Sequence, residues 1–160
     1  MKRFSCVTES ERETRRLAAR LARRLKKNDC LALTGDFGSG KTTFVKGLAE
    51  GLKVRRGERV SSPSFVILKI YRGKLAIYHF DLYRLDRPRD FDQVGLTEFA
   101  ASGGVTAIEW ADKVKDLLPE ETLTVRFSGM GPRKRRIRFM TRSERLARVA
   151  ESVVKRSSRS

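Results

Sequence analysis

Residues 35–42 read Gly-Asp-Phe-Gly-Ser-Gly-Lys-Thr and match the pattern G-x-x-x-x-G-K-[ST]. In this pattern the glycines let backbone N–H groups surround phosphate oxygens, and the helix that follows directs the positive end of its dipole at them. We expect the ammonium of Lys41 to reach the β and γ phosphates and the hydroxyl of Thr42 to join the shell of a magnesium ion. The predicted nucleotide contacts come from Asp36, Phe37, Gly38, Ser39, Gly40, Lys41, Thr42 and Thr43.

Two acidic residues stand where apolar, strand-like runs end. Asp81 follows residues 75–80, and Glu109 follows residues 105–108. In a parallel sheet, the ends of strands beside the phosphate loop are where a second magnesium ligand and a water-orienting group must lie. We assign Asp81 to magnesium, directly or through water, and Glu109 to orientation of the attacking water or to the outer metal shell. A surface salt bridge is the alternative for either acid taken alone.

These assignments define two expected sites. The expected catalytic residues are Lys41, Asp81 and Glu109. The expected magnesium site consists of Thr42, Asp81 and Glu109. The alternative for the loop itself, a glycine turn that only caps a helix, is disfavoured by the apolar run before it and the helical spacing after it, because strand, glycine loop and helix is the order that a phosphate site requires.

Three further features have two interpretations each. Residues 62–65, Ser-Pro-Ser-Phe, form either a loop that senses the γ-phosphate through its hydroxyls or a turn around a proline, and residue chemistry alone favours the turn. His79, the only histidine, lies between two aromatic residues and is better explained as a packed, hydrogen-bonded side chain than as a base. Trp110 either shapes the base or phosphate pocket or belongs to the core or rim.

The sequence favours ATP over GTP. Guanine specificity in the common GTPases depends on an N-K-x-D motif. The only asparagine, Asn28, is followed by Asp29, so this motif is absent from the sequence.

Around the phosphate loop, apolar periodicity predicts one α/β domain. A buried strand at 30–34 precedes the loop and a helix follows it. The runs 65–71 and 75–80 flank Arg72-Gly73-Lys74 and predict a hairpin. We expect a P-loop NTPase-like fold with a mixed, mostly parallel central sheet flanked by helices. The remaining predicted elements are a loop or short helix at 86–93, a helix at 94–101, and strands at 105–110, 123–127 and 136–140.

Helices are predicted near both ends of the chain. Thr8-Glu9-Ser10-Glu11 has the spacing of a capping box, and an amphipathic first helix follows it. A terminal helix begins at Ser143, and the last residues are expected to fray. We therefore assign residues 1–140 to a P-loop ATPase domain and residues 141–160 to a basic amphipathic helix with a frayed tail.

The net charge of +17 is unevenly distributed. There are eight basic and three acidic residues between positions 8 and 27, and eleven basic and two acidic residues between positions 132 and 160, whereas the middle of the chain is nearly neutral. This distribution predicts chemistry in the middle and attraction of an anionic partner at the edges. No run approaches the roughly 18 apolar residues of a membrane span, and Cys6 and Cys30 lack metal or disulfide spacing, so we expect a cytoplasmic protein with ordinary free thiols.

Taken together, these motifs strongly resemble the TsaE family, also called YjeE, the small bacterial ATPases of tRNA threonylcarbamoyladenosine synthesis. The matching stretches are residues 33–44, residues 62–65, the run Tyr-His-Phe-Asp-Leu-Tyr-Arg-Leu at 78–85, and Ile108-Glu109-Trp110. The resemblance covers about residues 8–128. Its His-x-Asp-x-Tyr-Arg and Glu-Trp signatures are far more diagnostic than the phosphate loop.

The resemblance implies an ATPase with little activity alone, using ATP and Mg²⁺. It would work with the TsaB and TsaD proteins, which transfer threonylcarbamoyl to the adenosine beside the anticodon in ANN-decoding tRNAs. It places Lys41 and Thr42 on phosphate and magnesium, and Asp81 and Glu109 near the metal and water. It also makes residues 62–65 a switch-like segment over the nucleotide. Ser64 replaces the usual Thr there and keeps the hydroxyl, so we include Ser64 and Trp110 among the expected nucleotide contacts.

Two features depart from the family pattern. Ala111 replaces the usual Pro after Glu-Trp, which affects only the local turn. The basic stretch from Arg133 onward is not explained by the pattern; it contacts tRNA phosphates, contacts an acidic face of a partner, or is a solvated helix. The expected partners are thus TsaB and TsaD, with tRNA reached indirectly or through the basic tails, and no membrane.

Two other functions remain open from the sequence. A small-molecule kinase uses the same phosphate loop, but it needs an acceptor pocket and usually a lid, for which the chain has no obvious insertion. A basic nucleic-acid-binding module with a vestigial ATP site is the second alternative.

Overall fold

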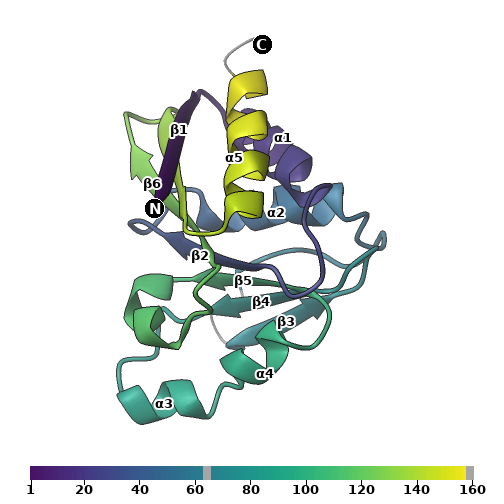
Figure 1. Cartoon of the computed structure of the whole chain (residues 1–160), viewed down its shortest axis with the longest axis vertical. Helices are drawn as coiled ribbons and strands as arrows, with labels where there is room; N and C mark the ends of the chain where they lie inside the picture. The colour runs from purple at the N-terminus through teal and green to yellow at the C-terminus, as the bar shows by residue number, and fades with distance from the viewer. Residues whose placement is uncertain (63–65, 158–160) are drawn as a thin grey trace.

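Seven strands form one sheet in the order β1-β7-β6-β2-β5-β4-β3 (Figure 1). The computed structural model describes residues 1–62 and 66–157. The strands are β1 (Lys2–Thr8), β2 (Cys30–Thr34), β3 (Leu68–Tyr71), β4 (Ile77–Asp81), β5 (Val105–Glu109), β6 (Leu123–Gly129) and β7 (Arg135–Thr141). The helices are α1 (Glu11–Ala22), α2 (Lys41–Gly51), α3 (Pro88–Asp92), α4 (Leu96–Ala100) and α5 (Glu144–Ser157), with a 3₁₀ segment η1 at Ala111–Leu117.

The centre of the sheet is parallel and its margins are antiparallel. β6, β2, β5 and β4 run parallel to one another, whereas β7 pairs with β6, β1 with β7, and β3 with β4 in the antiparallel direction. β2 and β5 are covered on both faces and are accordingly continuous apolar runs, as buried parallel strands usually are. The expected mixed sheet of a P-loop NTPase-like fold is confirmed.

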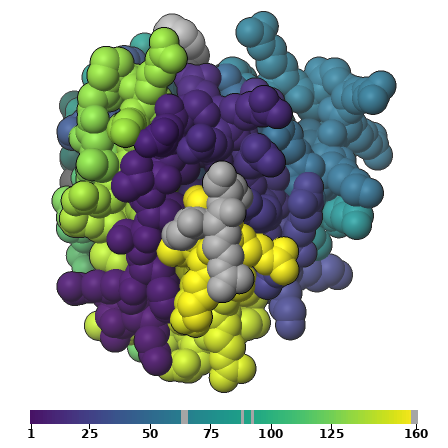
Figure 2. Space-filling model, turned by 90° about the horizontal axis from the view of Figure 1, so that it is seen from above, coloured from purple at the N-terminus to yellow at the C-terminus, as the bar shows by residue number. Residues whose placement is uncertain are grey.

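Helices cover the two faces of the sheet unequally. α1, α2 and α5 pack on one face and contribute to the larger hydrophobic core, together with residues of β1, β7 and β6. A smaller core on the other face joins residues of β2, β4 and β5 to α3, α4 and η1. Figure 2 shows α5 (yellow) beside the N-terminal segment (purple), with which it shares the larger core.

The first and second helices approach each other through glycines of α2. A Cβ atom built on Gly47 would lie 2.4 Å from the carbonyl oxygen of Arg15, and one on Gly51 would lie 2.4 Å from that of Ala19. Since both obstacles are backbone atoms, no side-chain rotation relieves the contact. This packing anchors α2, whose first residue is Lys41 of the phosphate loop.

We expect Gly47→Ala to lower the free energy of unfolding by about 1–3 kcal/mol, the usual effect of overpacking. The clash with Arg15 outweighs the roughly 0.5–1 kcal/mol that alanine ordinarily gains over glycine in a helix. Urea denaturation followed by circular dichroism measures the change. Gly129→Ala is the matched control, because a Cβ there meets no atom within 4 Å; equal stabilities of the two variants would contradict the packing argument.

Three sequence-based boundaries were wrong or incomplete. β1 was not predicted, and Thr8, expected to open the first helix, is instead the last residue of β1. The helix is capped by Ser10, whose hydroxyl accepts a hydrogen bond from the N–H of Glu13 at 3.1 Å, while the Glu9 N–H donates to the Glu13 carboxylate at 2.8 Å. The capping box therefore begins two residues later than predicted, at Ser10 instead of Thr8.

The predicted hairpin is confirmed as β3 and β4, and the terminal helix begins at Glu144 and contacts β1, β7 and α1. The frayed tail expected after it falls partly on residues 158–160, outside the described residues. Cys6 and Cys30 are free and buried. Over the described ranges, no helix is long and apolar enough to cross a membrane.

Candidate nucleotide site

The phosphate loop joins the end of β2 to the start of α2. Gly40, the residue before the helix, has φ 110°, a left-handed conformation that favours glycine. No side chain caps the helix, so the N–H groups of its first turn have no intrahelical partner and face the loop. A helix N-terminus of this kind is a binding site for phosphate, because it combines free N–H donors with the positive end of the dipole.

Lys41 lies folded over this loop. Its ammonium donates hydrogen bonds to the carbonyls of Gly35 at 2.7 Å and Asp36 at 2.8 Å, and it lies 4.2 Å from the ring centroid of Trp110. Burial lowers the pKa of Lys41 through desolvation, and nearby carboxylates, that of Glu109 first, partly offset this shift. The contacts with the two carbonyls and with the Trp110 ring hold the ammonium beside the place where phosphate oxygens are expected to bind.

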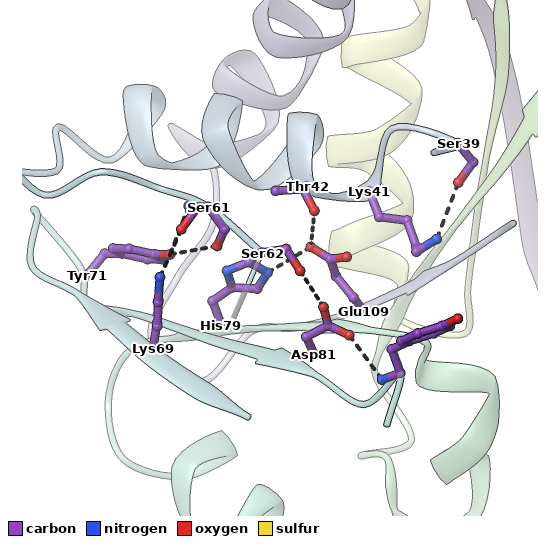
Figure 3. A network of polar contacts seen from close by, with 11 residues as sticks. Ser39, Lys41, Thr42, Ser61, Ser62, Lys69, Tyr71, His79, Asp81 and Glu109 are labelled. Atoms are coloured by element: carbon purple, nitrogen blue, oxygen red, sulfur yellow. Dashed lines mark hydrogen bonds and ion pairs between the residues drawn. The ribbon is translucent and has the colours of Figure 1, made fainter. Parts of the chain in front are cut away.

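Glu109 is the centre of the polar network in Figure 3. The hydroxyl of Thr42 donates to its Oε1 at 2.8 Å, and Nε2 of His79 lies 2.9 Å from the same atom. Since a carboxylate only accepts, Nε2 carries the proton of the histidine. His79 is fully buried and its Nδ1 has no partner among the described residues. His79 is thus a packed, hydrogen-bonded side chain, as expected, and its hydrogen bond holds the Glu109 carboxylate.

Asp81 lies beside Glu109 on the neighbouring strand. The two residues are paired in the register of β4 and β5, at the carboxyl ends of both strands. The hydroxyl of Ser62 donates to one oxygen of Asp81 at 2.6 Å, and the backbone N–H of Tyr83 donates to the other at 3.0 Å. Both carboxylates are therefore buried and held in fixed orientations next to Thr42 (Figure 3).

A cavity of about 300 Å³ opens above these residues. Three of the residues that line it were not predicted: Glu11, Tyr83 and Arg135. Arg135 donates from Nε to the carbonyl of Ser39 at 3.0 Å, which places a second cation beside the phosphate loop. The full lining is Glu11, Phe37, Gly38, Ser39, Gly40, Lys41, Thr42, Thr43, Ser62, Asp81, Tyr83, Glu109, Trp110 and Arg135.

Most of the predicted site residues meet at this cavity. Asp36 differs: its carbonyl accepts from Lys41, but the residue lines a neighbouring hollow behind the loop instead. Phe37 is 83% exposed and its ring lies 6.2 Å from that of Tyr83, so it forms part of the rim. Trp110 takes up a left-handed conformation with φ 60°, and its ring packs at a tilt against that of Tyr83, with 5.1 Å between the centroids. Both rings line the cavity, so Trp110 shapes it. Ser64 lies outside the described residues.

Thr42, Asp81 and Glu109 bring one hydroxyl and two carboxylate groups together, and these are oxygen donors of the type that magnesium binds. Mg²⁺ prefers one or two carboxylates, water and substrate phosphates to a complete protein cage. The residues that the structure describes contain no group of three or more His, Cys, Asp or Glu that could hold a metal ion.

Comparisons with known proteins identify the family of the chain. A family model described as "Threonylcarbamoyl adenosine biosynthesis protein TsaE" matches residues 8–137. The protein named tRNA threonylcarbamoyladenosine biosynthesis protein TsaE from Bacillus subtilis is 38% identical over 154 residues, covering 96% of this chain and 95% of the relative. The protein of the same name from Treponema pallidum is 41% identical over 120 residues, covering 75% and 87%.

A solved structure extends the agreement to the fold. The crystal structure of YdiB from Bacillus subtilis superposes with a TM-score of 0.81 at 35% identity, covering 97% of this chain and 96% of that one. The match includes the sheet, the phosphate loop and the C-terminal helix, since it spans nearly the whole length of both chains. The chain therefore belongs to the TsaE family.

Proposed function

We propose that the chain binds and hydrolyses ATP with Mg²⁺ in support of tRNA threonylcarbamoyladenosine synthesis. The observation that carries the proposal is the hydrogen bond of 2.8 Å between Thr42 and Glu109, because it joins the phosphate loop to the two carboxylates that end β4 and β5. N–H groups that can bind phosphate, oxygens that can bind a metal, and a buried carboxylate thus meet at one cavity. The relatives are named for this tRNA modification, which supplies the biological role.

The roles of the chain's own residues follow from their positions. The first turn of α2 would bind phosphate oxygens through its N–H groups, and Lys41 would exchange its loop carbonyls for the β and γ phosphates. Thr42 and Asp81 would hold Mg²⁺, Asp81 directly or through water, and the ion would neutralise developing charge on the phosphates. Glu109, held by His79, would orient the attacking water.

ATP is the proposed nucleotide because the guanine motif is absent. The only asparagine, Asn28, lies in the turn before β2, where its side-chain oxygen accepts a hydrogen bond from the N–H of Gly103 at 2.7 Å. Asn28 therefore has a structural role away from the cavity.

We further propose that the ATPase is weak alone and works in the cytoplasm with the TsaB and TsaD proteins. Hydrolysis should then rise when both partners are added, and tRNA modification by the three proteins should require it. The test measures phosphate release with and without TsaB and TsaD, using Lys41→Ala as the control. Equal tRNA modification by the wild type and Lys41→Ala would contradict the proposal and support a nucleic-acid-binding module with a vestigial ATP site.

A small-molecule kinase is the remaining alternative. Phosphate release that depends on the partner proteins and needs no second small-molecule substrate would argue against it. Transfer of the γ-phosphate to an added metabolite would support it.

Asp81→Asn is expected to raise the Mg²⁺ concentration for half-maximal hydrolysis by about 10- to 100-fold, the usual loss for a group that orients a metal's ligands. The amide keeps the oxygen that accepts from Tyr83, so the melting temperature should change little. A magnesium titration of ATP turnover checks the result. Asp116→Asn, an exposed position on η1, is the matched control, and an unchanged magnesium dependence in Asp81→Asn would remove this residue from the metal site.

A further inference from the structure

One face of the sheet is uncovered over β1, β7 and β6. The helices α1 and α5 lie on the other side of these strands (Figure 1), and within the described residues the smaller core takes no member from them. Burial alternates along these strands accordingly. In β7, Ile137 and Phe139 are buried in the larger core, whereas Arg136 before them and Arg138 between them are exposed. This uncovered sheet face is a flat surface rather than a core.

Cross-strand register arranges nine side chains on the uncovered sheet face in three rows. Because residues paired across antiparallel strands point to the same side, each row holds one residue from each strand. The strands are separated by about 4.8 Å, and alternate residues along one strand by about 7 Å. The rows are Arg3, Met140 and Thr124; Ser5, Arg138 and Arg126; and Val7, Arg136 and Ser128.

The charge on the uncovered sheet face is uncompensated. Arg3, Arg126, Arg136 and Arg138 are all exposed, and none of them forms an ion pair with another residue in ranges 1–62 and 66–157. None of the nine residues is acidic. Like charges on neighbouring strands repel each other, so the arrangement lowers stability and calls for a function.

The helical side of the molecule is also basic, and part of its positive charge is paired with acidic residues. Arg15 pairs with Glu50, Arg145 pairs with Asp29, and Lys155 pairs with Glu151 at 2.7 Å. Arg12, Arg23 and Arg148 on the helical side also form no ion pair among the described residues. The uncovered sheet face differs in that its nine adjacent positions hold four arginines and no acidic residue.

The composition of this face distinguishes a nucleic acid from a protein partner. Protein interfaces have an apolar centre enriched in aromatic residues, whereas nucleic-acid interfaces are more polar and much more positive. The uncovered sheet face has no aromatic side chain; its uncharged members are three hydroxyl residues, Val7 and Met140. Arginine, the only basic residue type on it, binds phosphate through two parallel N–H donors.

We propose that the uncovered sheet face binds the phosphate backbone of RNA. Four residues of the face, Thr124, Arg126, Ser128 and Met140, also line a hollow of about 600 Å³. Its other walls include Lys115 and Asp112 of η1, Trp110, and Gly35 and Asp36 behind the phosphate loop. The RNA site is therefore separate from the nucleotide cavity but borders the same loop. The proposal does not depend on ATP hydrolysis, because binding to the sheet face needs none of the residues Lys41, Thr42, Asp81 or Glu109.

The test measures anisotropy of a labelled tRNA transcript, without ATP, over a series of KCl concentrations. Each phosphate contact that is removed lowers the steepness of log K against log[salt] by about 1. The triple variant Arg126→Ala, Arg136→Ala, Arg138→Ala is therefore expected to lower this slope by about 3. The control triple Arg12→Ala, Arg23→Ala, Arg148→Ala removes the same charge from exposed positions within or directly after helices α1 and α5 and should change the slope by less than 1.

Two further measurements separate the proposal from its alternatives. Replacing the same three sheet arginines by lysine should keep the slope while weakening binding, which excludes a folding defect as the cause. Lys41→Ala should bind tRNA like the wild type, so failure of the ATPase proposal leaves this one intact. Equal slopes for the two alanine triples would overturn the proposal. Loss of TsaB–TsaD association with unchanged tRNA binding would also overturn it, by assigning the face to a protein.

Discussion

Glu109→Gln is expected to lower the rate of ATP hydrolysis by about 10²- to 10⁴-fold, the usual contribution of a positioned acid–base group. The substitution removes the negative charge that faces Thr42 and Lys41 but little of the packing. The amide oxygen of glutamine can still accept from the Thr42 hydroxyl and from Nε2 of His79, the two donors that Oε1 serves now. We therefore expect ATP to bind and the fold to persist while turnover is lost.

Single-turnover phosphate release in the presence of the partner proteins measures the loss of hydrolysis. Equilibrium titration with ATP measures the affinity that the variant is expected to keep. Glu98→Gln makes the same chemical change at an exposed position of α4 and should behave like the wild type. If Glu109→Gln hydrolysed ATP at the wild-type rate, Glu109 would have a structural role only, as the acceptor that joins Thr42 to His79.

His79 offers a second way to examine the same assignment. Its only hydrogen bond among the described residues goes to Glu109, and its other nitrogen is buried without a partner. A residue that acts through Glu109 should matter for turnover and little for ATP affinity. This distinction separates orientation of the carboxylate from a direct contact of His79 with the nucleotide.

The sequence was sufficient for the parts of the site that depend on local order. The loop 35–42 required only a strand before it and a helix after it, and both are present. Asp81 and Glu109 were found because each ends an apolar run, and the carboxyl ends of parallel strands meet at one edge of a sheet. Their pairing in β4 and β5 confirms that reasoning.

Other parts depended on contacts between distant segments. Arg135 reaches the loop only because β7 pairs with β6 beside β2, and nothing in the basic run from Arg133 distinguishes it from its neighbours. β1 was missed because only Cys6 and Thr8 of its residues are buried, which gives a weak alternation. The capping box was misplaced because Thr8 and Ser10 both precede a glutamate by three residues, and β1 takes up Thr8.

The uncovered sheet face also could not be predicted from the sequence, because it depends on strand pairing. The sequence identified excess positive charge near the C-terminus but assigned it to a terminal helix and tail. The fold separates this charge: Arg145 of α5 pairs with Asp29, whereas Arg136 and Arg138 of β7 stand beside Arg126 without counter-charge. Only strand register distinguishes these two groups of arginines.

Lys41→Ala is expected to lower ATP turnover by about 10²- to 10³-fold, the loss typical of one donor aimed at charge in the transition state. Lys41 is 5% exposed and burial already desolvates its ammonium, so its interaction with phosphate is stronger than that of a surface lysine. The neighbouring Lys46→Ala, at an exposed position of the same helix, is the matched control and should retain full turnover.

Trp110 supplies a direct measurement of nucleotide binding for this variant. It is the only tryptophan, and its ring lies 4.2 Å from the Lys41 ammonium. When Lys41 moves from Trp110 and the loop carbonyls to phosphate, the indole loses its cation contact, so ATP should change the intrinsic fluorescence of the wild type. In Lys41→Ala this change should be absent or displaced to higher ATP concentration. If Lys41→Ala gave the same ATP titration curve as the wild type, the loop would bind phosphate through its N–H groups alone. Lys41 would then act only in the chemical step.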